Sequence, residues 1–251
     1  MVAFSGGADS ALVAWVAHNT LGRDATLAVT AVSPSLAPED EHDCAALAAE
    51  WGLRWQAVAT DELADPAYTA NDGQRCAHCK SALMAVLAPL AAKEGATMVL
   101  GVNVDDLGDH RPGQVAAAEA GAVFPLVEAG FTKAQVRSCS RDLGLRTWDK
   151  PAAACLASRV PYGTPVSVGV LTEVAAAETA LRRLGFGQLR VRHYGDVARV
   201  ELPVDDLAVA LQRRGEVVAA VRSAGYRYVT LDLEGFRSGN LNGALPTRPH
   251  P

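Results

Sequence analysis

Short apolar segments alternate with helical patterns over the first 150 residues, and this alternation constrains the fold more than any other feature. Strands are predicted at residues 2–4, 27–32, 54–59 and 98–100, and helices at 11–20, 39–51 and 81–94. Strand–helix–strand repetition at this spacing requires crossover connections. The sequence therefore predicts an α/β domain built on a doubly wound, mostly parallel sheet with helices on both faces. Thr132 and Gln135 form a capping-box pattern that predicts one more helix, ending near Gly144.

The pattern changes after Pro151. A loop rich in Ala, Ser, Pro and Gly runs to residue 165, and a helix is predicted at 170–184. A hairpin follows at 188–194 and 197–202, with Gly195 and Asp196 in its turn, and then a helical stretch to residue 224 and a strand at 226–233. We therefore expect two domains, the α/β domain at 1–161 and a smaller α+β domain at 162–251.

Composition excludes several classes of protein. The chain has 251 residues, a net charge of -5 and 49% hydrophobic residues, so it can bury a sizeable core. No apolar run approaches the ~20 residues of a membrane span, and no signal-peptide pattern is present, which predicts a cytoplasmic protein with no membrane partner. The second half is mildly basic, which suits a phosphate-bearing ligand but argues against a duplex nucleic-acid binder.

A glycine-rich segment, S-G-G-A-D-S at residues 5–10, lies between the first predicted strand and the first helix. Backbone N–H groups in such a turn, together with the positive end of a helix, form a cradle for anions. Gly6 and Gly7 allow phosphate to approach the backbone, Ser5 and Ser10 offer hydroxyls, and Asp9 can bind Mg²⁺. The segment matches S-G-G-x-D-S, the loop of enzymes that split ATP between its α and β phosphates. An ordinary glycine turn is the less favoured interpretation.

Polar residues also follow the second and fourth predicted strands. Ser33 comes after the second strand, and Asn103, Asp105 and Asp106 come after the fourth. Ligands of doubly wound folds bind at the carboxyl edge of the sheet, where these residues are expected to lie. They are candidates for a nucleotide–metal site, although Asn and Asp also cap loops without binding anything.

The five cysteines of this unsecreted chain do not indicate a disulfide framework. Cys44 and Cys139 lie in helical patterns and are expected to be buried thiols. Cys76 and Cys79 form a C-x-x-C pair, a spacing used by zinc, iron–sulfur and redox sites alike. Cys155 lies between basic residues that would lower the pKa of a thiol, so it is a candidate nucleophile or metal ligand, with an inert core thiol as the alternative.

Six motifs in order make the chain recognisable. They are the glycine loop at 5–10, R-C-x-x-C-K at 75–80, N-x-D-D-x-x-D-x-R-P-G at 103–113, W-D-K-P-x-x-A-C-L-A-S-R at 148–159, R-x-R-H at 190–193 and G-F-R-S-G at 235–239. With these motifs the chain resembles, from beginning to end, the LarE family of ATP-dependent sulfur transferases. The resemblance implies the fold of the PP-loop ATP pyrophosphatases, also described as adenine nucleotide alpha hydrolase-like.

The resemblance implies a reaction as well. LarE-like enzymes adenylate the carboxylates of pyridinium-3,5-biscarboxylic acid mononucleotide, with release of pyrophosphate, and replace an oxygen of each by sulfur. The product becomes the nickel-pincer nucleotide cofactor of lactate racemase, so a nickel-inserting enzyme is the expected recipient. ATP and Mg²⁺ are the expected cofactors, with Ser5, Gly6, Gly7, Asp9, Ser10, Ser33, Asn103 and Asp106 as their site. A homo-oligomer, possibly a hexamer, is also implied.

Two sources of sulfur are known in such enzymes. Some members give up the sulfur of the cysteine at the position of Cys155, which becomes dehydroalanine. Members that also carry the C-x-x-C pair are thought to hold a [4Fe-4S] cluster on three cysteines, and this chain has all three, Cys76, Cys79 and Cys155. We therefore favour the cluster, with Cys155 as a sacrificial donor as the alternative. Two alternative hypotheses for the function are a tRNA-thiolating enzyme and a non-catalytic iron–sulfur or sulfur carrier.

The second half supplies the remaining candidates. Arg190 and Arg192 alternate on one predicted strand and therefore share a face, and with Arg237 they could bind the substrate phosphate, since guanidinium groups suit phosphate geometry. Solvated arginines on an exposed sheet are the alternative. Ser158, Arg159 and Glu178 lie near Cys155 by motif or by helix placement and are expected to orient the substrate.

Overall fold

The computed structural model describes residues 1–108, 112–151 and 154–237, and it forms two compact units. The first unit consists of Met1–Asp65 and Gln74–Ala154, and the second of Pro66–Gly73 and the chain from Cys155 onward. A short internal segment, residues 66–73, thus leaves the first unit and packs in the second. The boundary expected at residue 161 stays a prediction.

The first unit contains a parallel sheet of four strands in the order β3-β2-β1-β4. These strands are β1 (Val2–Ala3), β2 (Leu27–Val32), β3 (Arg54–Ala59) and β4 (Val99–Leu100). The predicted strands are therefore all present, although the first and last are shorter. Crossover connections through helices give the doubly wound α/β arrangement that the sequence predicts.

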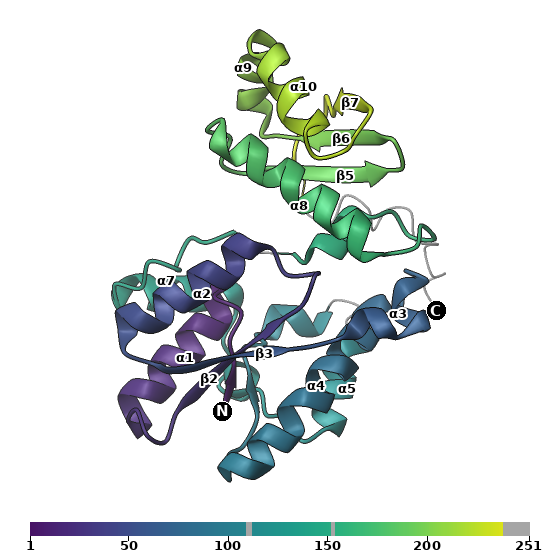
Figure 1. Ribbon diagram of the computed structural model, residues 1–251. Helices are drawn as coiled ribbons and strands as arrows, with labels where there is room; N and C mark the ends of the chain where they lie inside the picture. The colour runs from purple at the N-terminus through teal and green to yellow at the C-terminus, as the bar shows by residue number, and fades with distance from the viewer. Residues whose placement is uncertain (109–111, 152–153, 238–251) are drawn as a thin grey trace. The chain divides into compact units, whose positions relative to one another are not determined.

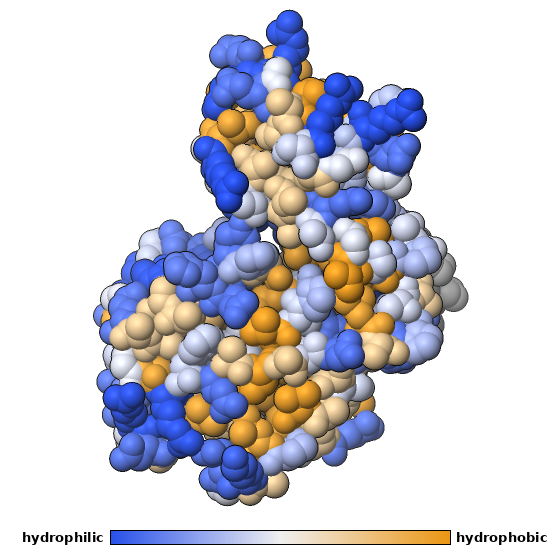
Figure 2. Space-filling model, viewed as in Figure 1, coloured by the Kyte–Doolittle hydropathy of each residue, from blue (hydrophilic) through white to orange (hydrophobic). Residues whose placement is uncertain are grey.

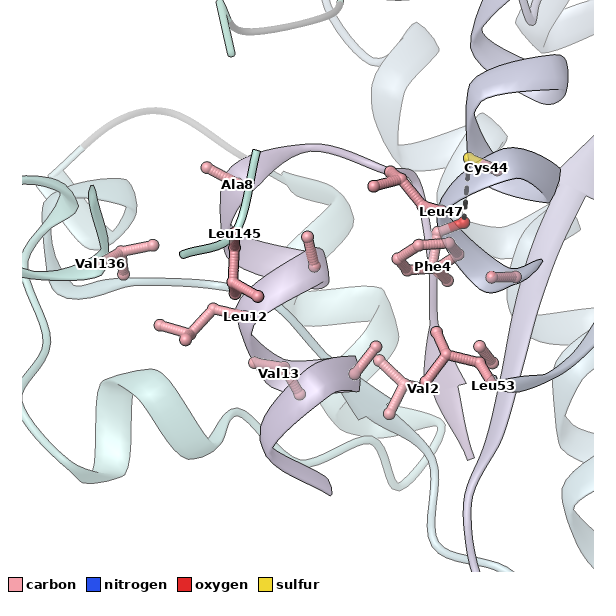
Figure 3. Packing of buried hydrophobic residues seen from close by; sticks show 14 of the residues in the cluster. Val2, Phe4, Ala8, Leu12, Val13, Cys44, Leu47, Leu53, Val136 and Leu145 are labelled. Atoms are coloured by element: carbon pink, nitrogen blue, oxygen red, sulfur yellow. Dashed lines mark hydrogen bonds between the residues drawn. The ribbon is translucent and has the colours of Figure 1, made fainter. Parts of the chain in front are cut away.

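Helices cover both faces of this sheet (Figure 1). One face packs against α1 (Ala8–Leu21), α2 (Pro38–Trp51) and α7 (Lys133–Asp142) through the cluster drawn in Figure 3. The other face packs against α4 (Arg75–Glu94) and α5 (Pro112–Glu119) through a second cluster that includes Met84, Leu87 and Leu100. The capping box predicted at Thr132 is confirmed, since its hydroxyl accepts from the Gln135 N–H and the Gln135 side chain accepts from the Thr132 N–H.

Helix α4 begins at Arg75, six residues before the predicted start at residue 81. The C-x-x-C pair therefore lies in the first turn of a helix, whereas the sequence placed it between a loop and the helix start. Several short elements had no sequence prediction: η1 (Glu62–Ala64), α3 (Pro66–Thr69), η2 (Val104–Gly108), α6 (Pro125–Glu128), η3 (Leu156–Arg159) and η4 (Val204–Asp206).

The second unit is the small α+β structure that the sequence predicts. Helix α8 (Val168–Arg183) precedes an antiparallel hairpin of β5 (Arg190–Tyr194) and β6 (Val197–Glu201), whose turn contains Gly195 at φ 63°. Helices α9 (Leu207–Gln212) and α10 (Arg214–Arg222) lead to β7 (Tyr228–Leu231), which pairs parallel to β6. A separate apolar cluster, with Leu181 and Val191 at its centre, holds these elements together.

None of the helices described is both long and apolar enough to cross a membrane. On the face drawn in Figure 2, each unit carries hydrophobic as well as hydrophilic residues. Such mixing is ordinary, because apolar atoms contribute more than half of the surface of folded proteins.

Candidate functional site

The glycine loop lies between β1 and α1, and its own hydrogen bonds fix its shape. The Ser10 hydroxyl accepts from the Ser5 N–H (3.2 Å), lies 3.0 Å from the Ser5 hydroxyl and donates to the Gly7 carbonyl oxygen (3.2 Å). Gly6 has φ 67°, a backbone conformation that residues with a Cβ rarely adopt. Because α1 begins directly after Gly7, the loop lies at a helix N-terminus, where the first backbone N–H groups have no partner within the helix, as an anion cradle requires.

Close packing around the loop leaves no room for a Cβ at two glycines. A Cβ on Gly6 would lie 3.0 Å from the Cys44 sulfur, and one on Gly101 would lie 2.6 Å from the Ser10 backbone nitrogen. The sulfur of Cys44 lies 4.0 Å from the Phe4 carbonyl oxygen, on the buried side (Figure 3). Burial raises the pKa of the Cys44 thiol to about 11, so Cys44 is the inert core thiol that the sequence predicts.

Asp9 is the centre of a polar network that joins three segments of the first unit. Its carboxylate accepts from the Asn103 side-chain amide (3.0 Å) and forms an ion pair with Lys133. The Asn103 side-chain oxygen accepts from the N–H groups of Asp105 (3.0 Å) and Asp106 (3.3 Å). Asp106 in turn accepts from the Asn103 N–H (3.2 Å), and Asp105 accepts from the Lys133 N–H (2.8 Å).

This network brings together the candidates Asp9, Asn103 and Asp106 as expected, but it adds a lysine that the sequence did not reveal. Asp9 and Lys133 are far apart in the chain, and no motif links them. The network contains three carboxylates and one ammonium group, which pairs with Asp9, so it keeps a surplus of negative charge. Oxygen donors with that surplus fit Mg²⁺, which proteins usually bind through one or two carboxylates together with phosphate oxygens.

A second lysine lies beside the loop. The Lys150 ammonium lies 2.5 Å from Asp43 and 4.0 Å from Asp40 on α2, and 3.6 Å from the position that a Cβ on Gly6 would occupy. Burial alone would raise the pKa of Asp43, but hydrogen bonds from Lys150 and Arg146 outweigh it and lower that pKa. Lys150 belongs to the W-D-K-P motif, so the sequence contained a signal for it even though no role was assigned.

Ser33, the remaining candidate for the nucleotide, does not join the Asp9 network. Its hydroxyl donates to Glu62 (2.5 Å) and accepts from the Ser35 N–H (3.2 Å). Glu62 is buried and also accepts from the Thr60 hydroxyl (3.1 Å). These residues follow β2 and β3, so they lie at the carboxyl edge of the sheet, where a nucleotide base or ribose binds in doubly wound folds.

The C-x-x-C pair lies in the first turn of α4, where residues three apart lie on the same side of a helix. Cys76 is exposed and Cys79 is partly exposed. Burial lowers the pKa of the neighbouring Lys80, while the charges of Cys79 and Cys76 act in the opposite direction. Within the described residues, no three His, Cys, Asp or Glu side chains lie close enough to bind a metal ion together.

Cys155 lies at the start of η3 in the second unit, and its thiol is exposed. The interpretation as an inert core thiol is therefore wrong. Arg159 donates to the Cys155 carbonyl oxygen (3.1 Å) and to the Ser158 hydroxyl (3.1 Å). Two further bonds, of 2.8 and 3.1 Å, join Arg159 to the fully buried Glu178, which also accepts from the Val191 N–H (3.0 Å). The four candidates Cys155, Ser158, Arg159 and Glu178 thus form one connected group.

Arg190 and Arg192 share a face of β5 as predicted, but both are buried, so the interpretation as solvated arginines is wrong. Arg192 donates to the Ser158 carbonyl oxygen (2.8 Å) and to Glu201 (2.8 Å), and its Nε has no partner in the described chain. The Arg190 guanidinium lies over the Phe236 ring, 4.8 Å from its centre, and the side chain makes no hydrogen bond or ion pair among the described residues.

Burial and the charges of Arg159 and Arg192 lower the pKa of Arg190 to about 10. A buried guanidinium without a carboxylate partner, next to two other arginines, is suited to an anionic ligand. Arg237 is different, because it is exposed and pairs with Glu234 on the same turn. Within the second unit the structure therefore joins Arg192 to the Cys155 group through the Ser158 carbonyl oxygen, and Arg190 lies near enough to Arg159 and Arg192 for their charges to lower its pKa. Ser238 and Gly239 lie outside the described residues.

The fold and the loop together define a class of protein. A parallel sheet with S-G-G-x-D-S after its first strand is the nucleotide-binding arrangement of the PP-loop enzymes, and residues 1–88 match the family model described as NAD synthase.

Whole-chain similarity then identifies the family. The chain is 42% identical, over 97% of its length and 89% of the relative, to pyridinium-3,5-bisthiocarboxylic acid mononucleotide synthase of Lactiplantibacillus plantarum. It therefore belongs to the LarE family, as the motifs predict. It is also 49% identical to an uncharacterized protein of Synechocystis sp., over 98% of the chain and 92% of that relative. An uncharacterized protein of Methanocaldococcus jannaschii is 25% identical over 95% of the chain and 90% of its own length.

Proposed function

We propose that this chain is an ATP-dependent sulfur transferase that converts pyridinium-3,5-biscarboxylic acid mononucleotide into its bisthiocarboxylic counterpart. The observation that carries the proposal is the 42% identity, over nearly the whole chain, to a synthase named for that product. Forming it requires an oxygen of each carboxylate to be replaced by sulfur. Because a carboxylate oxygen is a poor leaving group, the carboxylate must first be activated. The PP-loop would bind the ATP that activates it.

Activation is assigned to the first unit. A substrate carboxylate oxygen attacks the α-phosphorus of ATP, the bond between the α and β phosphates breaks, and pyrophosphate leaves. The loop N–H groups and the Ser5 hydroxyl would bind the leaving pyrophosphate, because the loop lies at a helix N-terminus, where anions are favoured. Asp9, with Asn103 and Asp106 around it, would bind Mg²⁺, which supplies positive charge to the phosphates. Ser33 would lie beside the base or ribose.

Substrate binding and sulfur delivery are assigned to the second unit and the C-x-x-C pair. Arg190 and Arg192 would bind the phosphate of the mononucleotide, with Arg237 as a further contributor. Arg159 fixes the Cys155 carbonyl oxygen and the Ser158 hydroxyl, and Glu178 orients Arg159. The exposed thiol of Cys155 is therefore attached to the same buried network that would bind the substrate, and we assign it to the sulfur-transfer step, in which AMP leaves.

An iron–sulfur cluster on Cys76, Cys79 and Cys155 is the form of sulfur delivery that we favour. Thiolates are the usual ligands of such clusters, and two of these thiols share one helical turn. Among the described residues no three His, Cys, Asp or Glu side chains lie together, so the cluster on these cysteines rests on the motif and not on their present separation. As the alternative, Cys155 would give up its own sulfur: its thiol displaces AMP from the adenylated carboxylate to form a thioester, and loss of the Cys155 α-proton then breaks the carbon–sulfur bond, which leaves a thiocarboxylate and dehydroalanine.

The test compares the wild-type protein with Cys155→Ala. Cys139→Ala is the control, because Cys139 has no part in the proposed reaction. In wild type we expect pyrophosphate release that depends on the mononucleotide, and a thiocarboxylate product by mass spectrometry. Cys155→Ala should keep pyrophosphate release and lose the product. If wild type releases no pyrophosphate, the proposal is wrong; if Cys155→Ala stops releasing it, Cys155 belongs to the activation step instead.

Iron and acid-labile sulfide, measured after anaerobic purification, separate the two forms of sulfur delivery. Iron that is lost on replacing Cys76, Cys79 or Cys155 would support the cluster. Iron-free protein that transfers one sulfur atom per chain, with dehydroalanine at position 155, would support the sacrificial route. We further propose that the protein is a homo-oligomer that passes its product to a nickel-inserting enzyme, for the nickel-pincer nucleotide of lactate racemase.

A further inference from the structure

Asn71 is an unusual residue in the segment that leaves the first unit. Its side chain is completely buried, and it is the one non-glycine residue with a positive φ (56°) among those that the structure describes. Asn tolerates the left-handed region better than other residues with a Cβ, but the conformation persists only where the surrounding contacts demand it.

Several hydrogen bonds of Asn71 reach the loop that follows η3. Its side-chain nitrogen donates to the carbonyl oxygens of Pro161 (2.8 Å) and Thr164 (2.8 Å), and its backbone oxygen accepts from the Gly163 N–H (3.0 Å). Next to it, the Thr69 carbonyl oxygen accepts from the Val166 N–H (2.9 Å). Several backbone groups of the loop at residues 160–166 are therefore paired with a distant segment, in addition to the bond within the loop from the Thr164 N–H to the Pro161 carbonyl oxygen (3.0 Å).

Asn71 and its partner loop both lie close in sequence to candidate cysteines. Asn71 lies five residues before Cys76, and Pro161 lies six residues after Cys155. Five residues span at most about 18 Å, so Cys76 cannot move further than that from Asn71, however the two units are arranged. From Pro161 back to Cys155 the chain includes the 3₁₀ turn η3, which is short.

We propose that Asn71 is a positioning residue that ties the C-x-x-C pair to the Cys155 loop, so that the three thiols can act as one centre. The inference rests on the three-cysteine centre of the proposed function. Without the contacts of Asn71, Cys76 and Cys155 are held together only by the long chain between them and by the remaining contacts of residues 66–73, such as the bond from the Val166 N–H to the Thr69 carbonyl oxygen (2.9 Å). With those contacts, the path between them is eleven residues and one set of hydrogen bonds, which raises their effective concentration toward one another.

A chemical cross-link tests this without ATP, iron or substrate, so its result is separate from that of the proposed function. The reduced full chain, with Cys139→Ser as background, is treated with a short bis-maleimide. Mass spectrometry then measures the rate at which Cys155 becomes linked to Cys76 or Cys79. Asn71→Gly keeps the positive φ but removes the side-chain donor, and Asn19→Ala is the control, since Asn19 donates one exposed bond within α1.

We expect Asn71→Gly to slow the cross-link at least about tenfold, with the control unchanged. Labelling of Cys76 and Cys155 by a maleimide with one reactive group should stay as in wild type, which a general loss of structure would not allow. Asn71→Asp, which keeps the size but replaces the donor by a carboxylate facing two carbonyl oxygens, should give the same loss. A rate within twofold of wild type, or no cross-link in wild type, would overturn the proposal.

Hydrogen exchange on the wild-type chain is the second measurement, because it needs no variant to fold. The Gly163 and Val166 amides should exchange only when the buried segment detaches, and therefore slowly for a loop. Exchange at the rate of exposed loop amides would contradict the tie through Asn71.

Discussion

At the scale of single residues, the packing of the glycine loop requires two residues that have no Cβ atom. A Cβ on Gly6 would lie 3.0 Å from the Cys44 sulfur, and a Cβ on Gly101 would lie 2.6 Å from the Ser10 nitrogen. Both distances are shorter than an ordinary van der Waals contact, so the backbone can approach these atoms only because both residues are glycine. The end of β4 and the start of α1 are thereby fixed against each other. This close approach places Asn103, which follows β4, within hydrogen-bond distance of Asp9, which lies in α1.

Gly101→Ala tests this packing. The new Cβ would lie 2.6 Å from the Ser10 nitrogen, and that atom is backbone and cannot rotate away. We expect the variant to lose about 1–3 kcal/mol of stability in the first unit and to bind Mg²⁺-ATP more weakly. Denaturant unfolding and equilibrium dialysis with ATP measure the two effects. Gly187→Ala is the control, because a Cβ there meets nothing within 4 Å. Unchanged ATP binding in Gly101→Ala would contradict the argument.

The thiols are also expected to differ in reactivity. Cys44 is buried with a pKa of about 11, so on the order of one thousandth of it is thiolate at pH 8. Cys76 and Cys155 are exposed. In the folded protein, iodoacetamide should therefore modify Cys76 and Cys155 well before Cys44. Labelling of Cys44 should rise about tenfold from pH 8 to pH 9, because thiolate is the reactive form. Peptide mass spectrometry checks both, and early modification of Cys44 would show that its site opens.

At the scale of elements, the hairpin of β5 and β6 depends on buried ion pairs. Glu201 is fully buried and accepts from Arg192 (2.8 Å) and Arg199 (3.0 Å). Removing one partner of such a pair leaves a buried charge, so Glu201→Gln should cost about 3–5 kcal/mol of unfolding free energy in the second unit. Glu216→Gln, in the exposed pair with Arg213, is the control and should change little. A small loss for Glu201→Gln would mean that water reaches Arg192.

Local signals explain which elements the sequence could predict. The capping box at Thr132 and the hairpin turn at Gly195 depend on neighbouring residues, and both are present. The start of α4 was missed because Gln74, its N-cap residue, makes no side-chain cap. The burial of Arg192 was missed for another reason: the carboxylate that compensates it, Glu201, lies on the next strand. Likewise, Lys133 and Asn71 reach partners that are distant in sequence, which no local pattern indicates.

At the scale of the whole molecule, the apolar clusters of the first unit share no residue with that of the second. A ligand that binds only the first unit should therefore stabilise that unit alone. At one hundred times its Kd, Mg²⁺-ATP should add about 2.7 kcal/mol of stability to the first unit. Hydrogen exchange should then slow in β1 and β2 and not in β5 and β6. Asp9→Asn, which removes the charge proposed to bind Mg²⁺, is the control and should show a smaller effect. Equal slowing in both units would mean that the nucleotide binds both, or that they unfold together through residues 66–73, which join them.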